Sequence, residues 1–234
     1  MKEEPGNKIR RKSRLVARGF ADTNDYKLDE TYAPVAGLTD VKFILAAANK
    51  LKLPIHHLDI KTAFLNARLE KPVYMRIFEG LNKYMNEKEG FEREYILKLE
   101  RSIYGLKVSP KQWNVLLDKV MKKLRFRSCP FQPCLYIWRS GNKFAIVLVY
   151  VDDILMTSND EDKLKEIKVR LKMEFETTDL GEVEKFLGMQ VYRDWNKQLI
   201  ILHQQNLIKS VLKRFGINDK SRTVHTPMQS TEAE

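Results

Sequence analysis

The feature that most constrains the fold is an apolar run from Phe144 to Val151 that ends in two adjacent aspartates. A run of eight residues rich in Val, Ile and aromatic side chains is typical of a buried β-strand and is far too short to cross a bilayer. Ile154 to Met156 follows Asp152 and Asp153 directly, so the pattern predicts a hairpin with two carboxylates at its turn. The chain must therefore fold around a β-sheet.

Two adjacent ionised carboxylates repel each other, and placing them beside a buried strand costs folding free energy. Their presence therefore suggests that they bind something positively charged. A third carboxylate, Asp59, lies at the end of a second predicted buried strand, from Leu53 to Ile60. If the two strands are neighbours, Asp59 and Asp152 face a shared site, where two Mg²⁺ ions roughly 4 Å apart would serve phosphoryl transfer. The peptide oxygen of Ile60 would complete the second ion's ligands. The alternative interpretation is a solvated turn, where aspartate is also favoured.

Helical patterns are interleaved with these strands. We expect helices to begin at the capping residues Thr39, Ser109 and Ser158, with Pro110 in the first turn of the second helix. A second hairpin and a last, basic helix are predicted over residues 186–202 and 207–215. This order mixes helices with antiparallel strands, so the predicted fold class is α+β rather than alternating β-α-β.

The composition limits the kinds of binding partner and the cellular compartment that we expect. The formal net charge is +11, which favours an anionic partner such as nucleic acid, although a solvated basic surface explains the charge equally well. The N-terminus lacks the apolar core of a signal peptide, and two cysteines make neither a disulfide framework nor a zinc spacing. We therefore expect a soluble intracellular protein, in the cytoplasm or the nucleus, that binds no membrane.

Short motifs follow one another in a recognisable order along nearly the whole chain, from Arg11 to Met228. They are Ser13–Phe20, Glu30–Val35, Leu58–Asn66 with Val73–Met75, Tyr104–Lys107 with Pro110 and Trp113, Tyr150–Asp153, Asp179–Gly181 with Phe186–Gly188, and Thr226–Met228. In this order they resemble the reverse transcriptase of copia-type LTR retrotransposon Pol polyproteins.

The resemblance implies an RNA-directed DNA polymerase. Such a nucleotidyltransferase joins deoxynucleoside triphosphates to a primer 3′-hydroxyl on an RNA or DNA template, with two Mg²⁺ ions for which Mn²⁺ can substitute. It also implies a right-hand polymerase fold, with an antiparallel sheet and packed helices in the palm. The expected divisions are partial fingers at 1–52, palm at 53–75, fingers at 76–108, palm with both hairpins at 109–203, and the start of a truncated thumb at 204–234.

The same resemblance assigns roles to individual residues. Asp59, Asp152 and Asp153 would be catalytic and would bind the metal ions together with Ile60. Phe64, five residues after the first aspartate, would be an aromatic gate that clashes with a 2′-hydroxyl, although an ordinary core aromatic is the alternative. The other expected nucleotide contacts are Tyr150 and the cations Arg11, Lys12 and Arg14, for which a solvated charged face is the alternative.

Two departures from the family pattern fall on the nucleotide side. Val108 stands where the family has a glutamine that contacts the nucleotide and template, and Lys111 stands where it has an arginine. The chain also ends soon after the expected thumb begins, which indicates a piece of a polyprotein or a domesticated copy. Two further interpretations therefore stay open: a weak or inactive fragment that only binds nucleic acid, and a carboxylate-metal nuclease.

Overall fold

The computed structural model describes residues 2–3, 9–10, 13–78, 80–81, 95–218 and 220–221. The chain falls into two compact units, Met1–Val183 and Glu184–Glu234. The predictions for Arg11, Lys12 and Thr226–Met228 lie outside the described residues.

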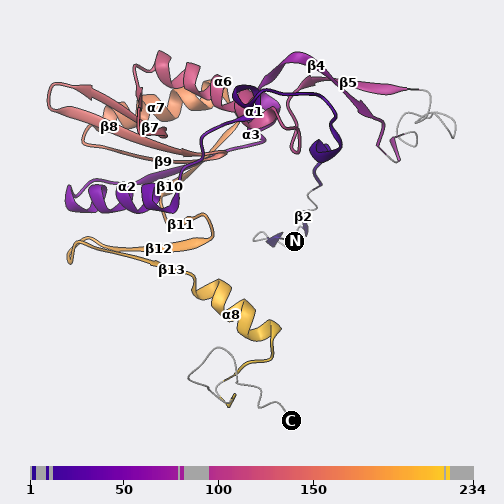
Figure 1. The fold of residues 1–234 in the computed structure, drawn as a ribbon. Coiled ribbons are helices and arrows are strands. Elements are labelled where there is room, and N and C mark those ends of the chain that lie inside the picture. Colours follow the sequence, from indigo (N-terminus) through magenta and orange to yellow (C-terminus); the bar gives the residue numbers. More distant parts are fainter. Residues whose placement is uncertain are drawn as a thin grey trace, which may run out of the picture. The chain divides into compact units, whose positions relative to one another are not determined.

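A six-stranded antiparallel sheet forms the centre of the first unit (Figure 1). Its strand order is β10-β3-β9-β8-β7-β6, so that strands from distant parts of the sequence lie side by side. β8 and β9 pair across a turn at Val151 and Asp152, which confirms the predicted hairpin. The strands are β3 (His56–Ile60), β6 (Arg127–Cys129), β7 (Gln132–Ser140), β8 (Lys143–Tyr150), β9 (Asp153–Ser158) and β10 (Thr177–Glu182).

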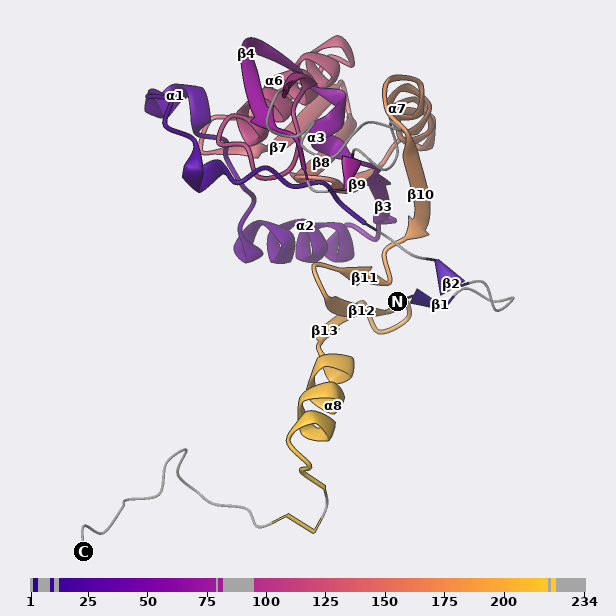
Figure 2. The ribbon, with the colours of Figure 1, turned by 90° about the vertical axis from the view of Figure 1, so that its right-hand side faces the viewer.

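Helices cover both faces of this sheet. α6 (Ser109–Lys123) and α7 (Glu161–Glu174) lie along one face, and α2 (Leu38–Lys50) lies along the other (Figures 1 and 2). With both faces covered, every residue of β9 after Asp153 is buried. The predicted α+β class is confirmed. The main apolar core includes Leu58, Ile60, Trp113, Leu117, Ile154, Met156, Ile167 and Leu171.

The three predicted helices exist, but the predicted capping residues are wrong. Ser109 is fully buried inside α6, so its hydroxyl takes a nearby partner and donates to the carbonyl of Ile103 at 2.7 Å. Ser158 is the last residue of β9, and its hydroxyl donates to the carbonyl of Phe144 at 2.5 Å. The residues that precede the helices are Gly37, Val108 and Asp160, in place of Thr39, Ser109 and Ser158.

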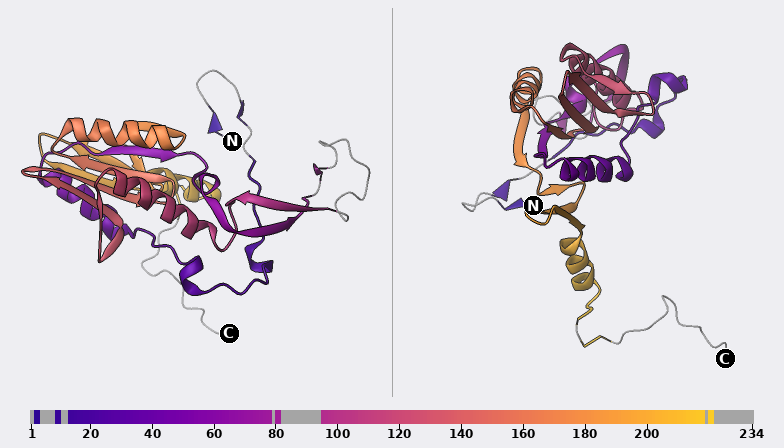
Figure 3. Two further views of the ribbon diagram at one scale, coloured as in Figure 1. Left: turned by 90° about the horizontal axis from the view of Figure 1, so that it is seen from above. Right: turned by 90° about the vertical axis from the view of Figure 1, so that its left-hand side faces the viewer.

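A two-stranded antiparallel ribbon projects away from the sheet beside α3 (Figure 3). Its strands are β4 (Arg68–Arg76) and β5 (Ile96–Arg101), and α3 spans Ala63–Asn66. A small second core, formed by Ala17, Val73, Ile103, Leu106 and Val108, packs beneath it. The remaining elements of the first unit are short: β1 (Lys2–Glu3), β2 (Ile9–Arg10), a 3₁₀ turn (Gly19–Ala21) and α1 (Leu28–Thr31).

Two glycines allow the N-terminal segment to touch the segment before α6, backbone against backbone. The Ala17 N–H donates to the carbonyl of Tyr104 at 2.8 Å. A Cβ at Gly105 would lie 2.0 Å from the Ala17 carbonyl oxygen, and a Cβ at Gly19 would lie 2.0 Å from the Gly105 oxygen. No side chain larger than hydrogen fits at either position without separating the two segments.

The second unit holds a three-stranded antiparallel sheet, in the order β11-β12-β13, followed by α8. The strands are β11 (Lys185–Phe186), β12 (Met189–Asp194) and β13 (Leu199–His203), and α8 spans Gln205–Arg214. Both the predicted second hairpin and the predicted basic helix are therefore confirmed. In the part of the chain that the structure describes, no helix has the length and apolar character needed to cross a membrane.

The close approach at Gly105 makes a testable prediction. We expect Gly105→Ala to lower the free energy of unfolding by about 3 kcal/mol, because the methyl group adds a backbone clash to the left-handed φ of +91°. Gly141→Ala is the matched control, since its φ is +58° and its Cβ would meet open space. That control should cost only about 1 kcal/mol in urea denaturation. Equal losses in the two variants would contradict the close-packing argument.

Candidate active site

The pairing of β3 with β9 brings the three predicted aspartates to one end of the sheet's central strands, where β3 ends and β9 begins. Asp59 lies directly opposite Asp153 in this pair, so their side chains leave the same face. The Ile60 N–H donates to the carbonyl of Asp152 at 2.8 Å, which joins the turn of the hairpin to the end of β3. The expectation that the two aspartate-bearing strands are neighbours is therefore confirmed.

The carboxylates are close enough to affect one another's ionisation. Burial raises the pKa of Asp152, and the negative charges of Asp153 and Asp59 raise it further. Hydrogen bonds from its own backbone and from the Tyr104 hydroxyl, 3.4 Å away, act in the opposite direction. The net effect is a raised pKa, as expected for like charges held together beside a core.

Asp153 has a partner of its own. Its Oδ1 lies 2.8 Å from Nε2 of His57, which is nearly buried and stands two residues before Asp59 on the same face of β3. An ionised carboxylate has no proton to give, so the imidazole must be the donor. His57 therefore occupies one oxygen of Asp153 and turns that carboxylate back along β3.

The carboxylate oxygens of Asp59 and Asp152 fit a divalent cation whose remaining ligands come from substrate and water. Among the described residues, no group of three or more His, Cys, Asp or Glu side chains is arranged to enclose a metal ion. Mg²⁺ does not need such a cage, because it commonly binds one or two carboxylates and keeps waters or phosphates as its other ligands. Asp59 and Asp152 supply hard oxygen ligands, and a cation between them would relieve their mutual repulsion.

Two aromatic rings stand beside Asp152. α3 positions Phe64, whose ring meets the Tyr104 ring edge to face at a centroid distance of 4.7 Å. The Arg14 guanidinium lies 5.2 Å from the centre of the Tyr104 ring. The structure thus brings the predicted residues Phe64 and Arg14 to one place, through Tyr104. Tyr104 was not predicted as a site residue, although it begins the motif Tyr104–Lys107.

Other predicted residues have different surroundings. The Ile60 side chain is fully buried in the main core, so only its backbone is available to the site. Tyr150 is half-buried and lies opposite Asp153. Val108 is buried in the small core with Val73 of the ribbon, and the expected effect of its replacing a glutamine on nucleotide contacts stays a prediction. Lys111 lines a separate cavity of about 210 Å³.

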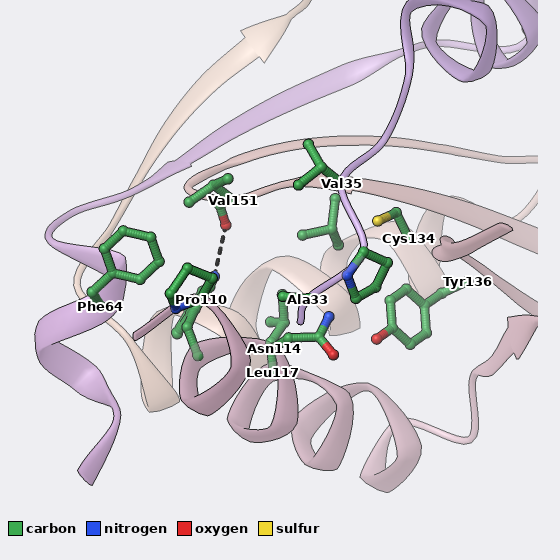
Figure 4. Close-up of a pocket in the computed structure, with 12 residues that line it drawn as sticks. Ala33, Val35, Phe64, Pro110, Asn114, Leu117, Cys134, Tyr136 and Val151 are labelled. Atoms are coloured by element: carbon green, nitrogen blue, oxygen red, sulfur yellow. Dashed lines mark hydrogen bonds between the residues drawn. The ribbon is translucent and has the colours of Figure 1, made fainter. Parts of the chain in front are cut away.

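A small apolar cavity of about 40 Å³ borders the turn of the hairpin (Figure 4). Phe64, Trp113 and Val151 are among the residues that line it, and the three aspartates are not. The Trp113 indole N–H donates to the carbonyl of Val151 at 2.9 Å, the bond drawn as a dashed line in Figure 4. The turn is thus held from beneath by α6.

The chain belongs to the reverse transcriptase (RNA-dependent DNA polymerase) family, whose model matches residues 1–230. It is 36% identical over 225 residues to a retrovirus-related Pol polyprotein from transposon TNT 1-94 of Nicotiana tabacum, covering 94% of this chain and 16% of that protein. It is 32% identical over 227 residues to the Pol polyprotein from transposon RE1 of Arabidopsis thaliana, covering 95% of this chain and 15% of that protein. The predicted resemblance to retrotransposon reverse transcriptases is confirmed.

The chain thus spans only about a sixth of the length of these relatives. Among solved structures, apo telomerase from Candida tropicalis matches with a TM-score of 0.40 and 14% identity, over 72% of this chain and 40% of that one.

The raised pKa of Asp152 predicts a pH-dependent gain in stability on its removal. A folded-state pKa above the unfolded value means that the ionised carboxylate opposes folding, and that this penalty fades as pH falls through the raised pKa. We expect Asp152→Asn to raise the free energy of unfolding at pH 7, in urea denaturation without divalent ions. The gain should shrink toward zero at acidic pH.

Asp25→Asn, in an exposed loop, removes the same charge away from the site and should give no gain. A loss of stability at pH 7 in Asp152→Asn would contradict the assignment of Asp152 to a cluster of repelling carboxylates.

Proposed function

We propose that this chain is the polymerase domain of a retrotransposon Pol protein and extends a primer 3′-hydroxyl with deoxynucleoside triphosphates on an RNA or DNA template. The observation that carries the proposal is the position of Asp59 on β3 beside the β8–β9 turn that carries Asp152, with the two joined by the hydrogen bond from the Ile60 N–H to the Asp152 carbonyl. Membership of the reverse transcriptase family supports the type of reaction.

The proposed mechanism assigns the aspartates to metal binding. Asp59, Asp152 and the peptide oxygen of Ile60 would hold two Mg²⁺ ions, or Mn²⁺ in their place, which lower the pKa of the primer hydroxyl and neutralise the triphosphate. Asp153 would add its negative charge beside the metal-binding carboxylates, and His57 would orient the Asp153 carboxylate. The sheet supplies rigid positions for these groups, as a reaction that depends on alignment requires.

The nucleotide would be selected and held by groups beside Asp152. The Phe64 ring packs edge to face on Tyr104, which restricts its motion, so a 2′-hydroxyl would clash with it. Arg14, close to the Tyr104 ring, would contact the triphosphate, together with Arg11 and Lys12 of the same basic segment. The net charge of +11 favours the binding of a template and primer.

A second candidate function is nucleic-acid binding without synthesis. Asp153 is engaged by His57, and Val108 stands where the family has a glutamine. A fragment that kept its basic surface and lost its chemistry would have these features as well. The experiment below separates the two candidates.

Primer extension on poly(rA)–oligo(dT) with Mg²⁺ tests the proposal. The parent chain should extend the primer, and Asp152→Asn should extend it at least about 100-fold more slowly, because one metal-binding carboxylate is lost. Asp25→Asn should match the parent chain, and all three proteins should bind the duplex equally in a filter assay. Extension that survives in Asp152→Asn would refute the assigned mechanism. Duplex binding by a folded parent chain that makes no DNA would favour the second candidate.

The assignment of Phe64 makes a prediction about sugar selection. Phe64→Ala should lower the ratio of kcat/KM for dTTP to that for UTP by at least about tenfold, since the ring that clashes with the 2′-hydroxyl is gone. The ratio is insensitive to the fraction of active enzyme, so partial unfolding does not change it. An unchanged ratio would show that Phe64 is an ordinary core aromatic.

A further inference from the structure

We propose that Trp113 is a positioning residue for this polymerase reaction, because its indole N–H holds the strained turn of the β8–β9 hairpin and thereby sets the direction of the Asp152 side chain. The inference rests on the proposed function, since it concerns the geometry of a metal-binding carboxylate. Trp113 itself touches no reacting group.

The turn that carries the aspartates is strained. Val151 has a φ of +56°, in the left-handed region that a β-branched residue rarely occupies. Such a conformation costs on the order of 1–3 kcal/mol and persists only where the surrounding structure enforces it. Something outside the hairpin must therefore hold Val151 in place.

Trp113 is suited to hold it. Its indole N–H donates to the Val151 carbonyl at 2.9 Å, and the side chain is only 3% exposed (Figure 4). The indole packs edge to face on Phe175, at the end of α7, with a centroid distance of 5.0 Å. A ring fixed by the main core has little freedom to follow the turn, so the turn must conform to the ring.

The bond to Val151 is one of two that determine the backbone at Asp152. The peptide group between Val151 and Asp152 is planar, so fixing the Val151 oxygen also fixes the direction of the Asp152 N–H. The next peptide group is held by the Ile60 N–H, which donates to the Asp152 carbonyl at 2.8 Å. With both flanking peptide groups held, φ and ψ of Asp152 are set, and so is the direction in which its carboxylate leaves the backbone.

The cavity beside the turn explains why a side chain, rather than water, should make this contact. Its volume of about 40 Å³ has room for a water molecule, and Asn114 and Tyr136 in its mostly apolar lining offer the polar partners that such a water needs. If the indole were shortened, this water would satisfy the Val151 oxygen, but it could reorient and would not fix the peptide plane. Loss of the indole N–H should therefore affect the geometry of the turn more than the stability of the fold.

Trp113→Phe tests the inference, with Trp138→Phe as the matched control. The second variant makes the same chemical change at a partly buried tryptophan on β7 that packs on the same core, away from the turn. The first readout is the hydrogen-exchange protection of the Ile60 amide, without divalent ions. The second is the pair of kcat and KM values for dTTP in primer extension, and melting temperatures are recorded for all proteins.

We expect Trp113→Phe to lower the protection of the Ile60 amide and kcat by about tenfold each, the effect of one hydrogen bond, with KM changed less than twofold. Trp138→Phe should leave the protection and kcat within twofold of the parent chain. Unchanged protection in Trp113→Phe, or equal effects in the two variants in proportion to their melting temperatures, would overturn the inference. A parent chain that makes no DNA would refute the proposed function, and the exchange data alone would then decide whether Trp113 holds the turn.

Discussion

The pairing of β3 with β9 is the interaction on which the rest of the site depends. It places Asp59 opposite Asp153 and lets the Ile60 amide hold the turn at Asp152, although these residues are separated by more than ninety positions in the sequence. A slip of one residue in this register would turn Asp59 to the other face of the sheet. The register is protected by burial, because Leu58 and Ile154 on these strands are fully buried.

The packing of helices on the sheet offsets the free energy cost of placing the aspartates close together. Burial, and after it the charges of Asp153 and Asp59, disfavours the ionised form of Asp152, and the raised pKa of this carboxyl reflects that cost. His57 offsets part of the repulsion by donating to Asp153, and the hydrogen bond from Trp113 to the Val151 carbonyl helps to hold the strained turn. The site therefore stores strain and repulsion that the packing of α6 and α7 on the sheet can balance. A divalent cation would remove part of the same cost.

The sequence was sufficient to predict the hairpin and the aspartates that it carries. It was not sufficient for features that depend on contacts between distant segments. A continuous apolar run followed by adjacent aspartates predicted the hairpin, because strand patterning is local. The start of α6 at Ser109 was predicted correctly, but the capping roles were misassigned, since burial of Ser109 and the extension of β9 through Ser158 depend on tertiary contacts. The burial of Val108 in the small apolar core was likewise not foreseen, because that core joins segments that are distant in the sequence. The contact of His57 with Asp153 was accessible in principle, since His57 and Asp59 share a face of one strand.

The most direct test of the central claim is the location of bound Mn²⁺ by anomalous scattering from crystals of the protein. Residues of β3 and of the β8–β9 turn should hold the ion, so we expect an anomalous peak between the carboxylates of Asp59 and Asp152. That peak should be absent in crystals of Asp152→Asn. Mn²⁺ bound elsewhere on the protein, with none between Asp59 and Asp152, would contradict the claim that the β3–β9 pairing builds a metal-binding active site.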